Sequence, residues 1–82
     1  KMEVKLDNTA KEKLLIPIDK ASGGFQRCLK RLQGNFNFGT SILTYDDVDL
    51  GQIIKYSQYP AGGGFEDRFK EIKRCIDEQS KL

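Results

Sequence analysis

The sequence contains no histidine and no tryptophan, and only two cysteines, Cys28 and Cys75, among its 82 residues. The absence of histidine excludes every histidine-dependent catalytic arrangement and the usual zinc spacings. We expect the cysteines to act as small apolar side chains on helices, with a disulfide or a reactive thiol as alternatives. The sequence therefore predicts a protein that is not an enzyme and that uses no metal or other cofactor.

A long hydrophobic run is also missing. The longest one, residues 14–18, is interrupted by Pro17, and the mean hydropathy of the chain is −0.56. A membrane-spanning helix needs about 20 apolar residues, and residues 1–4 show no hydrophobic stretch of signal-peptide length. We therefore expect one cytoplasmic domain over residues 1–82, with no membrane partner.

Charge is unevenly distributed between the two halves of the chain. Residues 1–40 carry eight Lys/Arg and four Asp/Glu, a net of +4, whereas residues 41–82 carry six and eight, a net of −2. The total of +2 is small. If the protein binds an anion, the first half is the better candidate to contact it.

Two similar segments lie 40 residues apart. ASGGFQRCLKRL spans residues 21–32 and AGGGFEDRFKEI spans residues 61–72. Both place a glycine pair and a phenylalanine before a helical pattern of apolar residues. We interpret this as an internal duplication of residues 1–40 and 41–82, with two coincidentally similar helix starts as the alternative.

Each half reads as strand, turn, strand, glycine-rich loop and helix. The predicted strands cover residues 2–6 and 14–18 in the first half and residues 40–45 and 50–59 in the second, where residues 46–49 form an acidic hairpin turn. One helix follows Gly24 and ends at Gly34; the other begins at Phe65 and ends near Gln79. The predicted fold class is α+β: two ββα units forming a four-stranded antiparallel sheet with two helices on one face.

The glycine pair before the first helix has two possible roles. Glycine permits a sharp turn from strand into helix, or it lets backbone N–H groups approach an anion at the helix N-terminus. The second copy has Glu66 and Asp67 at this point, whereas the first has basic neighbours. A hypothetical anion site for a phosphate-containing small ligand therefore comprises Lys20, Ser22, Gly23, Gly24 and Arg27.

A second set of candidate residues combines aromatic and basic side chains. Tyr45, Tyr56, Tyr59 and Lys55 fall on the predicted second hairpin. On a sheet face without helices they could stack against bases of single-stranded nucleic acid, or cover the seam of a dimer. Asp46, Asp47 and Asp49 lack the spacing of a calcium loop, so we predict no metal there.

These observations favour a non-enzymatic binding or inhibitor-type module that acts by protein-surface recognition, as a homodimer. The reason is that such a small sheet leaves one face and its edges to be covered by a partner or by self-association. The alternative function is a binder of a small anionic ligand or nucleotide at the glycine pair. The third is a binder of single-stranded nucleic acid.

Overall fold

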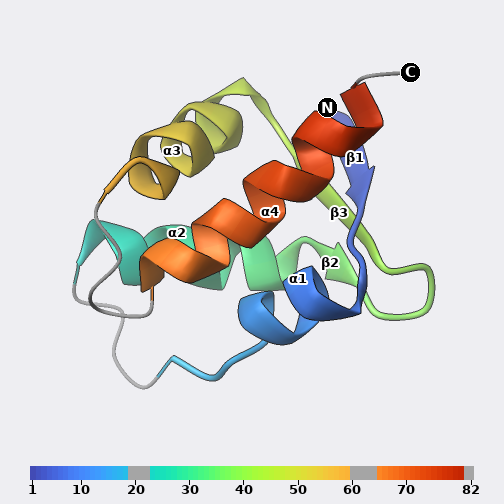
Figure 1. The fold of residues 1–82 in the computed structure, drawn as a ribbon. Helices are drawn as coiled ribbons and strands as arrows, with labels where there is room; N and C mark the ends of the chain where they lie inside the picture. Colours follow the sequence, from blue (N-terminus) through green and yellow to red (C-terminus); the bar gives the residue numbers. More distant parts are fainter. Residues whose placement is uncertain (19–22, 60–64, 81–82) are drawn as a thin grey trace.

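The computed structural model describes residues 1–18, 23–59 and 65–80. Within them the chain forms four helices and three short strands (Figure 1). In chain order these are β1 (Met2–Lys5), α1 (Asn8–Leu14), α2 (Gly24–Gly34), β2 (Phe36–Asn37), β3 (Ile42–Tyr45), α3 (Asp47–Ser57) and α4 (Phe65–Ser80). None of the helices in these ranges is long and apolar enough to cross a bilayer.

The sheet has the order β1-β3-β2, and both pairings are antiparallel. Val4 lies opposite Leu43 in the first pairing, and Phe36 lies opposite Leu43 in the second. Along β1 the side chains alternate, so that Val4 is buried while Glu3 and Lys5 are exposed. The sheet thus has one face on the core, as expected for a small antiparallel sheet.

The predicted four-stranded sheet with two helices is wrong. Residues 50–59 lie in α3 and the turn after it, and residue 14 ends α1 instead of starting a second strand. In both places an aspartate starts a helix. Asp7 accepts a hydrogen bond from the backbone N–H of Ala10, and Asp46 accepts one from Asp49. Aspartate suits turns and helix N-caps alike, so the local sequence allowed either outcome.

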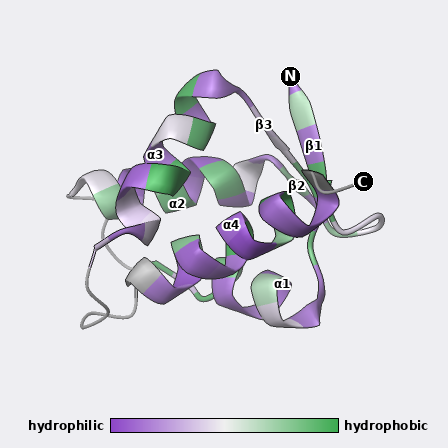
Figure 2. Cartoon of the chain, turned by 45° about the horizontal axis from the view of Figure 1, so that its top comes forward, coloured by the Kyte–Doolittle hydropathy of each residue, from purple (hydrophilic) through white to green (hydrophobic). Residues whose placement is uncertain are grey.

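Helix α4 forms the centre of the core. Its side chains Phe69, Ile72 and Cys75 are buried against α3, α1 and β1, while Figure 2 shows that its outer surface is hydrophilic. Helices α2 and α4 match the two helices predicted from the apolar spacing, and α2 ends at Gly34 as expected. An apolar period of 3.6 was therefore a sound indicator in these two segments.

Each half of the chain shows the element order strand, helix, helix: β1-α1-α2 in the first and β3-α3-α4 in the second, with β2 between them. Equivalent buried positions are 39 residues apart in the strands and first helices, and 40 apart in the second helices. The pairs are Val4 and Leu43, Leu14 and Ile53, Leu29 and Phe69, and Leu32 and Ile72. The duplication stays a prediction, and its repeating unit is now βαα instead of ββα.

Candidate functional site

Helices α2 and α3 lie side by side in opposite directions. Near the end of α2, Arg31 Nη2 lies 2.9 Å from Asp46 Oδ2 at the start of α3. At the other end of the pair, the ring of Phe25 lies 4.3 Å from that of Tyr56, centroid to centroid. The N-terminal end of α2 therefore adjoins the C-terminal end of α3, as Figure 1 also shows.

At this junction four aromatic rings pack together, and we call Phe25, Tyr56, Tyr59 and Phe69 the aromatic cluster. Phe25 lies 5.3 Å from Tyr59 and 5.9 Å from Phe69, and Tyr56 lies 5.1 Å from Phe69. These distances are those of favourable edge and offset contacts. Phe69 is fully buried, whereas Tyr59 remains 41% exposed, so the cluster extends from the core to the surface.

Lys55 adds a positive charge beside these rings. Its Nζ lies 5.6 Å from the centroid of the Tyr56 ring, at the outer limit of a cation–π contact. The Lys55 side chain is exposed. The accessible part of the junction is therefore an aromatic surface with a cation at its border.

The close approach of the Tyr56 hydroxyl accounts for glycine at position 24. A Cβ atom on Gly24 would lie 2.6 Å from the Tyr56 hydroxyl oxygen, a distance that real Cβ contacts do not show. The Cβ of a residue at position 23 would meet the end of the Gln26 side chain at the same distance, and that side chain is free to move. Close approach of Tyr56 thus explains the second glycine of the pair but not the first.

The structure describes three of the five residues predicted to bind an anion. Gly23 is the N-cap of α2, Gly24 is its first residue, and Arg27 is exposed on the helix. Lys20 and Ser22 lie outside the described residues. The Tyr56 hydroxyl lies where a Cβ on Gly24 would be, although Gly24 itself is exposed. The adjoining C-terminal end of α3 carries the negative end of a helix dipole. Anion binding here stays a prediction, with a less positive potential than the sequence suggested.

The four residues assigned to the second hairpin do not share one surface. Tyr45 lies in β3 with 6% of its surface exposed, and burial raises the pKa of its phenol. Lys55 and Tyr56 lie on α3, and Tyr59 follows it. The stacking surface on a bare sheet face is therefore wrong, because residues 46–59 form no hairpin. Sequence reasoning also missed Phe25 as a neighbour of the tyrosines; the spacing of Tyr56 and Tyr59, three residues apart, was the available signal.

A charged network fixes the opposite end of the α2–α3 pair. Asp46 and Asp49 form a capping box at the start of α3, and the backbone N–H of Asp49 is the main reason that the pKa of the Asp46 carboxyl is lowered. Asp49 is buried, and its Oδ1 lies 3.1 Å from Arg31 Nε without the geometry of a hydrogen bond. Arg31 thus provides the positive charge that the buried carboxylate needs.

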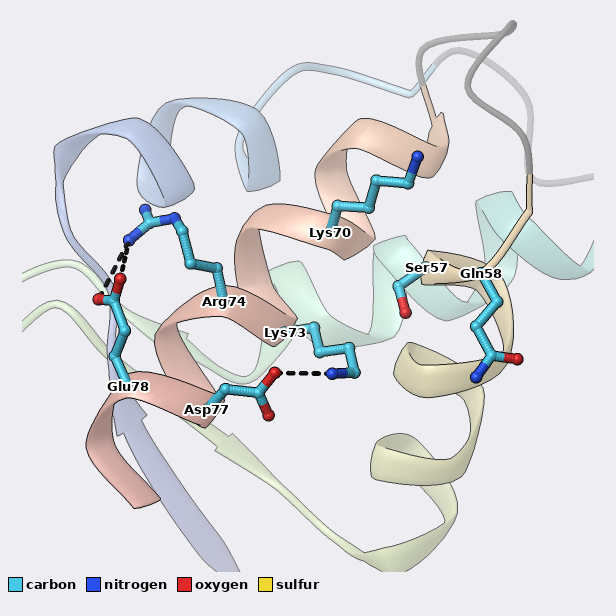
Figure 3. Close-up of a pocket in the computed structure, with 7 residues that line it drawn as sticks. All are labelled: Ser57, Gln58, Lys70, Lys73, Arg74, Asp77 and Glu78. Carbon is cyan, nitrogen blue, oxygen red and sulfur yellow. Dashed lines mark hydrogen bonds and ion pairs between the residues drawn. The ribbon is translucent and has the colours of Figure 1, made fainter. Parts of the chain in front are cut away.

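An open groove of about 580 Å³ runs between the end of α3 and the outer face of α4 (Figure 3). Lys73 Nζ lies 2.6 Å from Asp77, and Arg74 Nη1 lies 3.1 Å from Glu78. These ion pairs compensate much of the charge in the groove. Ser57 and Gln58 line the groove at the end of α3.

The two thiols are buried and poorly suited to nucleophilic chemistry. Burial raises the pKa of Cys28 to about 11, with the nearby Asp49 carboxylate as a further cause, and burial also raises the pKa of Cys75. A thiolate is the reactive form of cysteine, and it is disfavoured at both positions. Residues 1–18, 23–59 and 65–80 contain no group of three or more side chains that could hold a metal ion.

Comparisons of the chain with protein-family descriptions, with curated proteins and with solved structures gave no significant match.

Proposed function

We propose that this protein is a non-enzymatic binding module that recognises a partner protein through the surface at the junction of α2 and α3. The surface comprises Phe25, Tyr56, Tyr59 and Lys55, and we call it the recognition surface. The observation that carries the proposal is the exposure of Tyr59, which is 41%, although its ring packs on the Phe25 ring.

Tyrosine at such a position favours protein recognition. Aromatic side chains are enriched in the residues that dominate binding energy, because they bury a large area with little loss of conformational freedom. The packing of Phe25 against Tyr56 and Tyr59 holds the rings in place before a partner binds, which lowers the entropic cost of association. A partner with an apolar side chain for Tyr59 and a carboxylate for Lys55 would fit this surface.

Two matched variants test the proposal. Tyr59→Ala removes the exposed ring of the recognition surface, whereas Phe38→Ala removes a 70% exposed ring on the turn between β2 and β3, at the far side of the molecule in Figure 1. We expect affinity capture with the wild-type chain, followed by quantitative mass spectrometry, to yield a protein that Phe38→Ala retains and Tyr59→Ala loses.

The captured protein is then purified, and its dissociation constant is measured by calorimetry with all three forms of the chain. We expect Tyr59→Ala to weaken binding at least tenfold, since truncation of a central aromatic residue costs about 2 kcal/mol or more. Equal affinities for Tyr59→Ala and the wild type would contradict the proposed surface.

A further inference from the structure

At the outer edge of β1, a side chain makes the hydrogen bonds that a neighbouring strand would make. The backbone N–H of Lys5 donates to Oε1 of Gln79 at 3.0 Å, and Nε2 of Gln79 donates to the carbonyl oxygen of Lys5 at 2.7 Å. One carboxamide therefore satisfies both backbone groups of one residue. A hydrogen-bonded residue of a neighbouring antiparallel strand would do the same.

The register of β1 shows which of its backbone groups point away from β3. The backbone N–H of Leu6 donates to the carbonyl oxygen of Ser41, and two residues earlier in the same register Val4 lies opposite Leu43. The backbone groups of Leu6 and Val4 therefore point toward β3. Because hydrogen-bonded and non-hydrogen-bonded pairs alternate in an antiparallel ladder, the N–H and C=O groups of Glu3 and Lys5 both point outward. Among the described residues no strand pairs with this edge.

The exposed side chains of β1 are complementary in charge to those of a second, antiparallel copy of the same strand. Glu3 and Lys5 are exposed on the same face of β1, on either side of the buried Val4. When two copies of β1 run antiparallel with Val4 opposite Val4, Glu3 of one copy lies opposite Lys5 of the other, twice. Each of these pairs brings together outward backbone groups, as a hydrogen-bonded pair requires, and opposite charges, as favourable cross-strand pairs require.

We propose that a second copy of this chain pairs with β1 in this register, displacing the carboxamide of Gln79 and joining two sheets into one. Gln79 then controls the accessibility of the edge: while it is bound to Lys5 it blocks association, as natural proteins block exposed strand edges. This surface is separate from the recognition surface, so the inference is independent of the proposed function.

Charge exchange provides a direct test. Glu3→Lys places two lysines on the edge and Lys5→Glu places two glutamates there, so each variant alone pairs like charges in the proposed register. We expect each to lower the association constant at least tenfold in sedimentation equilibrium at low salt. An equimolar mixture of the two should form a heterodimer, and the double exchange Glu3→Lys with Lys5→Glu should restore self-association.

Gln79→Ala tests the blocking role. We expect it to raise the association constant above that of the wild type and to protect the amide protons of Glu3 and Lys5 from exchange as concentration rises. The inference is overturned if Gln79→Ala stays monomeric at millimolar concentration, or if a dimer forms whose association constant the single charge exchanges leave unchanged. Circular dichroism of each variant verifies that the fold is retained, and the heterodimer in the mixture would exclude loss by misfolding.

Discussion

At the scale of single residues, the contact between Gly24 and Tyr56 is the most informative. Alanine is normally better than glycine inside a helix, yet a Cβ on Gly24 would lie 2.6 Å from the Tyr56 hydroxyl oxygen and 3.6 Å from the ring carbon that carries it. We expect Gly24→Ala to destabilise the protein by about 1–3 kcal/mol, as overpacking does. In the Tyr56→Phe background the same change should be neutral or stabilising. Urea unfolding of the four proteins measures this cycle.

Gly23→Ala is the matched control for this cycle. The Cβ of this alanine meets only the end of the Gln26 side chain, so we expect no more than the cost of alanine at the N-cap, about 1 kcal/mol or less, and no dependence on Tyr56. If Gly24→Ala is equally harmless with Tyr56 present, close approach of the hydroxyl is not the reason for glycine at this position.

The buried thiol of Cys28 makes stability depend on alkaline pH. Its pKa is raised in the folded protein from an ordinary value of 9.0 to about 11, so the unfolded chain loses this proton first. Stability from this group is complete below pH 9 and is lost as pH rises toward 11. We expect the unfolding free energy of the wild type to fall more between pH 8.5 and 11 than that of Cys28→Ala. Equal losses would show that Cys28 is not protected from ionisation.

At the scale of elements, the segment after Asp46 shows what the sequence could and could not predict. Its β-branched and aromatic residues favoured a strand, but the buried positions Asp49, Ile53 and Ser57 recur every four residues, as in a helix. The aspartates of the presumed turn cap that helix. The helices from Gly24 and Phe65 were predictable because their apolar stripes are long and regular, whereas α1 and α3 depend on N-caps that local sequence does not separate from turns.

The candidate site, too, was predictable only in part from the sequence. Tyr56, Tyr59 and Lys55 were selected from the sequence, but their grouping with Phe25 follows from α3 being a helix antiparallel to α2. Tyr45 does not belong to this group, because its position in β3 places its side chain in the core. Residue chemistry was therefore predictable, whereas proximity depended on an element that had been assigned wrongly.

The two N-cap aspartates make stability depend on acid pH. Hydrogen bonding to the backbone N–H of Ala10, and then to Arg74, lowers the pKa of Asp7 below its ordinary value of 3.8; the pKa of Asp46 is lowered chiefly by the N–H of Asp49. Such groups stabilise the fold above their unfolded pKa, and this contribution is lost as pH falls through the lowered values. We expect urea midpoints to decline as pH falls from about 5 to 2.

Asparagine substitutions isolate this effect. Asp7→Asn and Asp46→Asn preserve a side-chain oxygen that can cap the helix but remove the charge. Each should lower the urea midpoint at pH 7 and leave it nearly unchanged at pH 2. Asp47→Asn is the control, since α3 is capped by Asp46 and Asp49. A midpoint that declines with acid as steeply in Asp7→Asn and Asp46→Asn as in the wild type would contradict this account.

At the scale of the whole molecule, α4 connects regions that are distant in the chain. It packs on α3, α1 and β1, its Arg74 Nη2 lies 2.6 Å from Asp7 at the cap of α1, and its Gln79 binds Lys5 in β1. Elements from both βαα halves therefore depend on the last helix. Because the sheet is small, we expect the halves to unfold together and not one after the other.

Phe69→Ala tests this cooperativity. The ring is fully buried and contacts Phe25 from α2 and Tyr56 from α3, so its loss leaves a cavity where α2, α3 and α4 meet. We expect a cost of about 3–5 kcal/mol, a large part of the stability of a domain of this size, against about 1 kcal/mol for Phe38→Ala, whose exposed ring makes an edge contact with Phe36. Helical and tyrosine circular dichroism signals should disappear in a single transition. Loss of the tyrosine signal while most helical signal persists would show that the two halves are stable separately, and that α4 does not unite them.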